Sequence, residues 1–338
     1  QTALTQSEFA DHLRQCLPEF AHNDKLAVAV SGGPDSLALA ALLHDMARNN
    51  NGRPTLHIIT IDHGLRDESA QEARHVARIV NDWPAARHVT LEWTGEKPTT
   101  GLQEAARNAR YALITDYCRE HGIAQICMAH HADDQAETVL FRLACGSGLD
   151  GLAGMPARQE LTSGITLARP LLSVGKARLL AKCQAYGLDY VEDPGNDDIA
   201  FTRPRLRQAY DVLAGEGLTG QRLQRTAYRL GRARSALAHY TGTVIDNYVK
   251  KEEKSWTIAS ADFATLPEEI ALRVIQAACV EIGRDGDYPP RLVKQEALLA
   301  RLREERNFKG ATLGGCQFRK SRDGAWLYIQ SETGKQYA

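Results

Sequence analysis

The chain has 338 residues, of which 43% are hydrophobic and 25% are charged, with a formal net charge of −1. This length predicts two domains, the composition is typical of a globular protein, and the net charge gives no sign of nucleic-acid binding by the chain as a whole. No apolar run approaches the roughly 20 residues of a membrane span, and the N-terminus lacks a signal-peptide pattern. We therefore expect a cytoplasmic protein without membrane contacts.

The first half of the chain alternates short apolar runs with helical patterns. Thr5 and Glu8 have the spacing of a capping box, which predicts a helix near the N-terminus. Strands are predicted at 25–30, 56–62, 88–93 and 124–129, and helices at 37–48, 69–82, 102–120 and 134–144. This alternation predicts an α/β domain, 1–205, with a Rossmann-like, mainly parallel sheet covered by helices on both faces.

Ligands of such sheets bind at the carboxyl ends of the strands. Three predicted strands end in unusually polar loops, SGGPDS after Val30, HGLRDES starting with His63 after Asp62, and HHADDQ after Ala129. These loops are therefore the first place to look for chemistry.

The first loop has the composition of a pyrophosphate-binding turn and consists of Ser31, Gly32, Gly33, Pro34, Asp35 and Ser36. The glycines allow the backbone to approach phosphate oxygens, the amides at the next helix N-terminus point at an anion, and the serines add hydroxyl donors. Asp35 would repel phosphate directly, so it implies a divalent cation, and Mg²⁺ is the usual one. The alternative is an ordinary turn in which Ser and Asp cap the helix.

Two common nucleotide motifs are excluded. A P-loop requires a Lys that this loop lacks. A Gly-x-Gly-x-x-Gly spacing occurs at Gly146, Gly148 and Gly151, but it follows a predicted helix rather than a strand. We interpret it as a chance match or as the C-terminal turn of that helix.

The third loop carries the densest group of titratable side chains. His130 and His131 precede a predicted helix, on which Asp134 and Glu137 share a face because they are three residues apart. The two acids suit Mg²⁺, a cationic amine, or both, whereas a zinc site is disfavoured because the HxxxH spacing is missing. The alternative is that Asp133 and Asp134 only cap the helix.

Beyond about residue 198 helical patterns dominate, and no strand is predicted before residue 310. We expect a mainly helical, Arg-rich second domain, 206–338, that ends in a small hairpin formed by 317–319 and 326–329. Segment 201–240 holds eight arginines and two acidic residues, a local balance of +6, and four of them have helical spacing: Arg222, Arg225, Arg229 and Arg232. The alternative is a solvated basic helix face.

These motifs carry a family resemblance. SGGPDS resembles the SGGxDS loop of the PP-loop ATP pyrophosphatases, which adenylate a substrate. HHADDQAET with the glycine turn after it resembles a signature of the tRNA(Ile)-lysidine synthetases. The segments EAARNARY (104–111), RPLL (169–172) and VEDPGNDDIAFTRPRLR (191–207) agree with that family. Five blocks in the family's order cover about the first 210 residues.

The resemblance implies a ligase that uses ATP and Mg²⁺. In this family ATP adenylates the C2 oxygen of the wobble cytidine of tRNA(Ile) with a CAU anticodon, and the ε-amine of L-lysine then displaces AMP from C2. The expected nucleotide-binding residues are Ser31, Gly32, Gly33, Pro34, Asp35, Ser36, Asp62, His63 and His131. The expected catalytic residues are Asp35, Arg110, Asp134 and Glu137, with Asp35 and Asp134 as metal ligands. The expected tRNA contacts are Arg107, Arg203, Arg205, Arg207, Arg222, Arg225 and Arg229.

One position departs from the family pattern, because Cys145 stands where the family often has Arg. The runner-up function is a tRNA thiolation enzyme that uses the same adenylation, and a third alternative is a tRNA-binding protein without catalysis. Thiolation needs catalytic cysteines or a cluster-binding CxxC, but the seven cysteines include no CxxC pair and are expected to be reduced thiols. The sequence leaves the oligomeric state open, a homodimer included.

Overall fold

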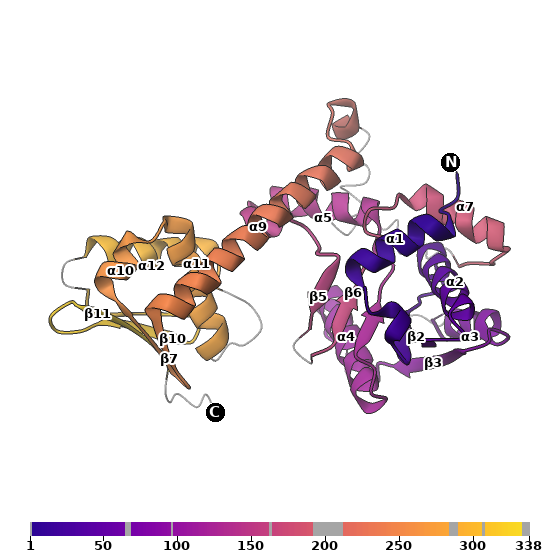
Figure 1. Ribbon diagram of the computed structural model, residues 1–338, viewed down its shortest axis with the longest axis horizontal. Coiled ribbons are helices and arrows are strands. Elements are labelled where there is room, and N and C mark those ends of the chain that lie inside the picture. The colour runs from indigo at the N-terminus through magenta and orange to yellow at the C-terminus, as the bar shows by residue number, and fades with distance from the viewer. Residues whose placement is uncertain are drawn as a thin grey trace. The chain divides into compact units, whose positions relative to one another are not determined.

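The computed structural model describes residues 2–64, 69–95, 97–161, 164–191, 212–283, 290–305 and 308–332. The chain divides into two compact units, Gln1–Arg229 and Leu230–Ala338. The expected domain boundary after residue 205, and with it Arg203, Arg205 and Arg207, lies outside the described residues. Figure 1 shows the elements of both units.

The first unit is built on a six-stranded sheet whose order is β3-β2-β1-β4-β6-β5. Neighbouring strands pair in parallel except β5, which runs antiparallel to β6. The strands are β1 (Lys25–Ala29), β2 (Thr55–Asp62), β3 (Ala86–Glu92), β4 (Gln125–Cys127), β5 (Arg158–Glu160) and β6 (Thr166–Ala168). The mainly parallel α/β sheet predicted from the alternating pattern is therefore confirmed.

The helices of this unit are α1 (Gln6–Cys16), the 3-10 turn η1 (Phe20–His22), α2 (Pro34–Asn49), α3 (Ser69–Val80), α4 (Leu102–Glu120), α5 (Ala132–Ala144), α6 (Leu149–Leu152) and α7 (Lys176–Tyr186). Helices α2 to α5 begin and end within a few residues of their predicted positions, whereas η1, α6 and α7 were not predicted. The predicted capping box is present, since the Glu8 amide donates to Thr5 Oγ1 and the Thr5 amide donates to Glu8 Oε2. After α5, Gly146 has φ +70, which confirms the helix C-terminal turn.

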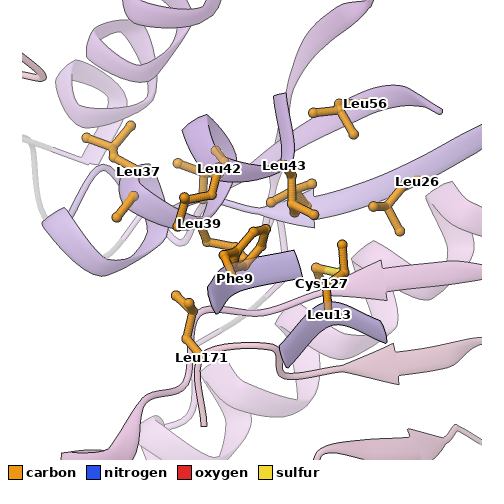
Figure 2. Packing of buried hydrophobic residues seen from close by; sticks show 14 of the residues in the cluster. Phe9, Leu13, Leu26, Leu37, Leu39, Leu42, Leu43, Leu56, Cys127 and Leu171 are labelled. Carbon is orange, nitrogen blue, oxygen red and sulfur yellow. The ribbon is translucent and has the colours of Figure 1, made fainter. Parts of the chain in front are cut away.

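The two faces of the sheet carry separate hydrophobic clusters, because alternate strand residues point to opposite sides. On β1, Leu26 and Val28 pack with α1 and α2 residues such as Phe9 and Leu39 (Figure 2), whereas Ala27 joins a cluster that includes Ile114 of α4. Both faces are thereby buried, as parallel sheets require. The carboxyl ends of the strands remain as the edge where polar loops gather.

A smaller cluster joins the start of α9 (Gly220–Tyr248) to α5. Leu223 and Ala227 are buried against Ala136, Val139 and Leu140 of α5. The Gln224 side-chain amide also donates to the Leu172 carbonyl at 3.2 Å. The first turns of α9 are thus fixed to the helix that carries the predicted acids Asp134 and Glu137.

The second unit contains more strand than the sequence predicts. Its antiparallel sheet has the order β7-β8-β11-β10-β9, with β7 (Val249–Glu252), β8 (Ser255–Ala259), β9 (Ala311–Leu313), β10 (Cys316–Lys320) and β11 (Trp326–Ser331). The predicted hairpin is β10–β11, but the absence of strands before residue 310 was wrong. The strand β7 was missed because three of its four residues are exposed Lys or Glu, which hide the apolar alternation of a strand.

Three further helices cover this sheet: α10 (Ser260–Thr265), α11 (Glu268–Ile282) and α12 (Leu292–Glu304). The core of the unit includes Trp256, Ile275 and Phe318, all nearly inaccessible to solvent. Among the described helices of both units, none combines the length and apolarity that a membrane span requires.

Candidate active site at the carboxyl edge of the parallel sheet

The SGGPDS loop joins the end of β1 to the start of α2. Gly33 is the N-cap and Pro34 the first helical residue, so the next amides of α2 have no partners within the helix. Within the loop, the Ser31 amide donates to Ser36 Oγ (3.1 Å), and that hydroxyl donates to the Gly33 carbonyl (2.9 Å). Gly32 has φ +87, a conformation that side-chain-bearing residues rarely adopt. The loop therefore has the backbone conformation and the free amides that suit an anion at a helix N-terminus.

His131 lies between two carboxylates from different elements. Its Nε2 is 3.4 Å from Asp35 Oδ2 on α2 and 3.5 Å from Asp134 Oδ2 on α5. The imidazole is 5% exposed. Asp35 Oδ1 is also buried and has no hydrogen-bond partner among the described residues. The structure therefore brings together Asp35 and Asp134, the residues predicted to share a metal, around a buried imidazole.

The charge of His131 follows from these neighbours. Burial alone lowers the pKa of the imidazole, but Asp133, Asp35 and Asp134 outweigh it and raise the pKa to about 10. The ring is thus an imidazolium at neutral pH. It neutralises part of the repulsion between carboxylates that otherwise converge beside the SGGPDS loop.

The two neighbouring acids of α5 have different tasks. Asp133 Oδ2 accepts the Lys176 amide at 2.8 Å and so caps α7, and contacts with His131 and that amide lower the pKa of Asp133. Asp134 Oδ2 accepts the His131 amide at 3.0 Å and completes a capping box at the start of α5. Capping is therefore part of the role of both acids. Asp134 also approaches the same His131 nitrogen, Nε2, as Asp35, whereas Asp133 Oδ2 lies 3.4 Å from Nδ1. Glu137 is half-buried one turn further along α5.

A second group of side chains follows β2 and β3. Asp62 Oδ1 accepts hydrogen bonds from Ser69 Oγ and from the Gly64 amide at 2.8 Å, and the Ser69 contact lowers the pKa of Asp62. The His63 ring meets the Trp93 ring edge-on, with centroids 6.1 Å apart. Lys97 Nζ lies 4.6 Å from the centroid of the Trp93 ring.

Trp93 and Lys97 were not predicted as site residues, although Trp93 carries a positional signal. Trp93 directly follows β3, so the rule that ligands bind at carboxyl ends of strands applies to it as well. Arg110 of α4 lies close enough to His63 to influence its charge. Burial is the main cause that lowers the pKa of His63, and the charge of Arg110 lowers it further.

The other predicted tRNA contacts lie on α4 and α9. Arg107 is exposed on α4 and lies over the Tyr111 ring, its guanidinium carbon 5.1 Å from the centroid. On α9, Arg222, Arg225, Arg229 and Arg232 are exposed on the side opposite the buried Leu223 and Ala227. Arg222 Nη1 also donates to the Gly217 carbonyl at 3.1 Å, which anchors this first arginine.

The cysteines give no sign of sulfur chemistry. Six of the seven are buried, and burial raises the pKa of Cys16 to about 11 and that of Cys118 to about 12. Such thiols are protonated and poor nucleophiles. Cys145 is exposed as the C-cap of α5. Within the described ranges, no three His, Cys, Asp or Glu side chains are grouped as a metal-binding cluster.

Comparison with known proteins supports one class. A model of the PP-loop domain matches residues 5–211. The structure also resembles the U34-tRNA thiolase NcsA from Methanococcus maripaludis with its [4Fe-4S] cluster. The TM-score is 0.55 over 69% of this chain and 80% of that chain, at 17% sequence identity, which supports the fold alone. The fold, the SGGPDS loop and the family model define an ATP-binding PP-loop domain.

Similar curated proteins identify the family within the PP-loop class. The tRNA(Ile)-lysidine synthase of Bradyrhizobium diazoefficiens is 43% identical over 301 residues, which is 87% of this chain and 82% of that protein. The tRNA(Ile)-lysidine synthase of Methylobacterium nodulans is 44% identical over 298 residues, 88% of this chain and 86% of that protein. The chain belongs to the tRNA(Ile)-lysidine synthase family, whose members are ATP-dependent ligases.

Proposed function

We propose that this protein ligates L-lysine to C2 of the wobble cytidine of tRNA(Ile) with a CAU anticodon, using ATP. The observation that carries the proposal is the convergence of Asp35, His131 and Asp134 beside the SGGPDS loop, in a chain of the lysidine synthase family. The product pairs with A instead of G and changes the specificity of the tRNA from Met to Ile. We place this reaction in the cytoplasm.

ATP would bind at the start of α2. The free first-turn amides and the hydroxyls of Ser31 and Ser36 suit the β and γ phosphates, because fixed donors at a helix N-terminus stabilise anions. Asp62 and His63, one strand over, would bind the nucleoside part. Gly32 and Gly33 leave the phosphates room to approach the backbone.

The residues present also fit Mg²⁺. Asp35 offers a buried oxygen without a hydrogen-bond partner among the described residues, and Asp134 supplies a second carboxylate close to it. Magnesium commonly takes one or two carboxylates and completes its shell with phosphate oxygens and water. When bound, the ion would neutralise the charge of the departing diphosphate.

The chemistry would proceed in two displacements. The C2 oxygen of cytidine attacks the α-phosphorus of ATP, the bond to the bridging oxygen breaks, and diphosphate leaves. Arg110 projects from α4 and suits the charge that develops on the phosphorus. The lysine ε-nitrogen then attacks C2, and the C2–O bond breaks to release AMP.

The acids of α5 suit the lysine side of the reaction. Asp134 and Glu137 can hold the ε-ammonium, and one of them can accept the proton that the nitrogen must lose before it attacks. Glu137 is half-buried, which leaves it accessible to a long flexible amine. His131 Nε2, which lies near both carboxylates, would orient Asp35 and Asp134.

The thiolation alternative is not favoured. It needs a reactive cysteine or a bound cluster, yet burial raises the pKa of Cys183 to about 11 beside the SGGPDS loop, where its Sγ donates to the Pro34 carbonyl. The exposed Cys145 has no second cysteine near it in the sequence. Lysine, not sulfur, is therefore the proposed nucleophile.

The test is diphosphate release by the purified protein with ATP, Mg²⁺ and a tRNA(Ile)(CAU) transcript, with and without lysine, followed by mass analysis of the wobble nucleoside. A lysine-sized mass gain on cytidine is expected only when lysine is present. Diphosphate release that leads to a sulfur-sized change with a sulfur donor, or no turnover with this tRNA, would contradict the proposal.

A further inference from the structure

A buried arginine remains outside the proposed chemistry. Arg169 directly follows β6 and is 3% exposed. Its Nη1 donates to the Pro156 carbonyl at 2.8 Å and its Nη2 to Gln159 Oε1 at 3.2 Å. Its Nε is buried without a hydrogen-bond partner in the described part of the chain.

The charge of Arg169 has no counter-ion among the described residues, since none of the ion pairs found there includes it. Taking a guanidinium out of water without a partner carries a penalty of several kcal/mol. Burial lowers the pKa of Arg169, and the neighbouring charge of Arg107 lowers it further. Guanidinium groups stay protonated in proteins, so Arg169 is a fixed buried cation. Hydrogen bonds to the Pro156 carbonyl and to Gln159 alone would not require a buried positive charge.

Tyr111 links this cation to the surface. Arg107 Nη2 donates to the Tyr111 hydroxyl at 3.4 Å, and Arg107 also lies over the face of the Tyr111 ring. Tyr111 and Arg107 both influence the charge of Arg169, so the buried guanidinium lies within electrostatic reach of this pair. Tyr111 therefore restrains a long side chain that solvent would otherwise leave free, next to a buried cation.

We propose that Arg169 and Tyr111 are positioning residues that hold Arg107 as a preformed arm for a phosphodiester of the RNA substrate. This inference rests on the proposed RNA-modifying function. An exposed arginine normally loses side-chain entropy when it binds, whereas one already fixed on a ring loses less and binds more tightly. The buried charge of Arg169 adds to the positive potential that an anion meets at Arg107. The favoured anion is a nucleic-acid phosphate rather than ATP, because the phosphate-binding amides of α2 belong to a different loop.

The decisive variant is Tyr111→Phe, which removes only the hydroxyl and keeps the ring. The matched control is Tyr117→Phe on the same helix, whose hydroxyl contacts His57 Nδ1 at 2.9 Å instead of the arginines. We expect Tyr111→Phe to raise the Kd for tRNA(Ile)(CAU) transcript about five-fold, a size typical of coupled neighbours. The KM for ATP and the melting temperature should match those of the control.

Coupling distinguishes positioning from a general structural role. In the Arg107→Ala background, Tyr111→Phe should have no further effect on RNA binding, because the residue that it positions is gone. Arg169→Lys should also weaken RNA binding, and its effect should likewise vanish with Arg107→Ala. Additive losses, an equal loss in Tyr117→Phe, or an equal rise in the KM for ATP would overturn the inference. Coupled RNA binding without lysidine formation by the wild type would reject the proposed function and leave this inference standing.

Discussion

At the scale of single residues, three neighbouring positions show why side-chain type alone does not define a role. Asp133, Asp134 and Glu137 all lie on the first turns of α5, yet Asp133 caps α7 while Asp134 approaches His131 Nε2 beside Asp35. Their spacing predicts which acids share a helix face, but the direction of each carboxylate depends on tertiary partners such as the Lys176 amide. The sequence therefore predicts that these acids lie together, but it does not predict which contacts each of them makes.

The first prediction concerns Asp35. Asp35→Asn keeps the size of the side chain and removes its charge, so we expect diphosphate release to fall at least about 100-fold. The free energy of unfolding should fall by only about 1 kcal/mol, because the N-terminus of α2 loses one favourable charge. Denaturant unfolding and a diphosphate assay measure the two effects.

The control for this variant is Asp24→Asn, which removes an exposed carboxylate just before β1, at the opposite end of that strand, where it pairs with Arg53. It should leave turnover unchanged. Turnover by Asp35→Asn within about ten-fold of wild type would contradict a direct role for this carboxylate in ATP chemistry.

The second prediction separates the two loop glycines. Gly33 has φ −74, and an added Cβ there would lie 3.6 Å from Ser31 Oγ, an ordinary contact. Gly33→Ala should thus change the free energy of unfolding by less than about 1 kcal/mol. The KM for ATP should nevertheless rise about ten-fold, because the methyl group occupies the space through which phosphate approaches the amides.

The comparison variant is Gly32→Ala, whose φ of +87 forces a side-chain-bearing residue into an unfavourable conformation. It should lower the free energy of unfolding by about 1–2 kcal/mol. Thermal unfolding of both variants measures the change in stability, and ATP titration measures the change in the KM for ATP. If Gly33→Ala binds ATP as wild type does, phosphate does not lie against this face of the loop.

At the scale of helices and strands, the periodic spacing of hydrophobic residues was enough to predict most elements of the first unit. The predicted helix at 102–120 matches α4, and the predicted strands match β1 to β4 within a few residues. Two short strands, β5 and β6, were not predicted, since three residues are too few to show a period. The exposed, charged strand β7 was not predicted for a different reason. Its stability comes from pairing with β8 and not from a pattern of apolar residues.

The candidate site residues also divide into those predicted from their position in the sequence and those that were not predicted. The polar loops after β1, β2 and β4 were found from position alone, whereas Trp93, Tyr111 and Arg169 were not assigned roles. Their significance arises from interactions with other residues, such as those of Tyr111 with Arg107 and Arg169. The interaction of Tyr111 with Arg169 has no local sequence signal because these two residues are far apart along the chain, whereas Arg107 and Tyr111 lie four residues apart on α4.

The third prediction concerns the link between α1 and α7. Hydrogen bonds from Thr5 and from Arg178 lower the pKa of Glu8 from 4.5 to about 2. A depressed carboxyl pKa means that Glu8 stabilises the fold above pH 4.5, and that this contribution is lost as the pH falls through about 2. Glu8→Gln should melt at a lower temperature than wild type at pH 7, and the difference should shrink steadily between these two pH values.

Melting curves across this pH range check the prediction, and Glu253→Gln, an exposed position in the β7–β8 turn, serves as the control. The control should follow the wild-type curve at every pH. A constant difference between Glu8→Gln and wild type down to pH 2 would show that the capping geometry, not the charge, accounts for the stabilisation.

At the scale of the whole molecule, the near-zero net charge conceals a local concentration of arginine. The chain has 41 Lys and Arg against 42 Asp and Glu, yet α9 presents four exposed arginines along one side. The buried side of its first turns packs on α5, whose own N-terminus holds Asp134. One helix thereby connects a basic surface to the proposed reaction centre, an arrangement suited to an anticodon loop held by its phosphates and modified at one base.

The last prediction tests that surface by its salt dependence. Each phosphate that an arginine neutralises releases counter-ions, so log Kd varies with log salt concentration by about 0.7–0.9 per contact. Arg225→Ala and Arg229→Ala should each weaken tRNA binding and reduce this slope by about that amount. Arg14→Ala, which removes an exposed arginine that pairs with Asp11 on α1, should change neither.

Sequence specificity provides the second readout of the same variants. Phosphate contacts carry no base information, so Arg225→Ala and Arg229→Ala should weaken binding equally for tRNA(Ile)(CAU) and for a tRNA with another anticodon. The rate of lysine incorporation at saturating tRNA should stay near that of wild type, because these side chains would bind the body of the substrate and not the reacting base. A lower saturated rate with an unchanged salt slope would instead place α9 in the chemistry and remove it from the proposed RNA surface.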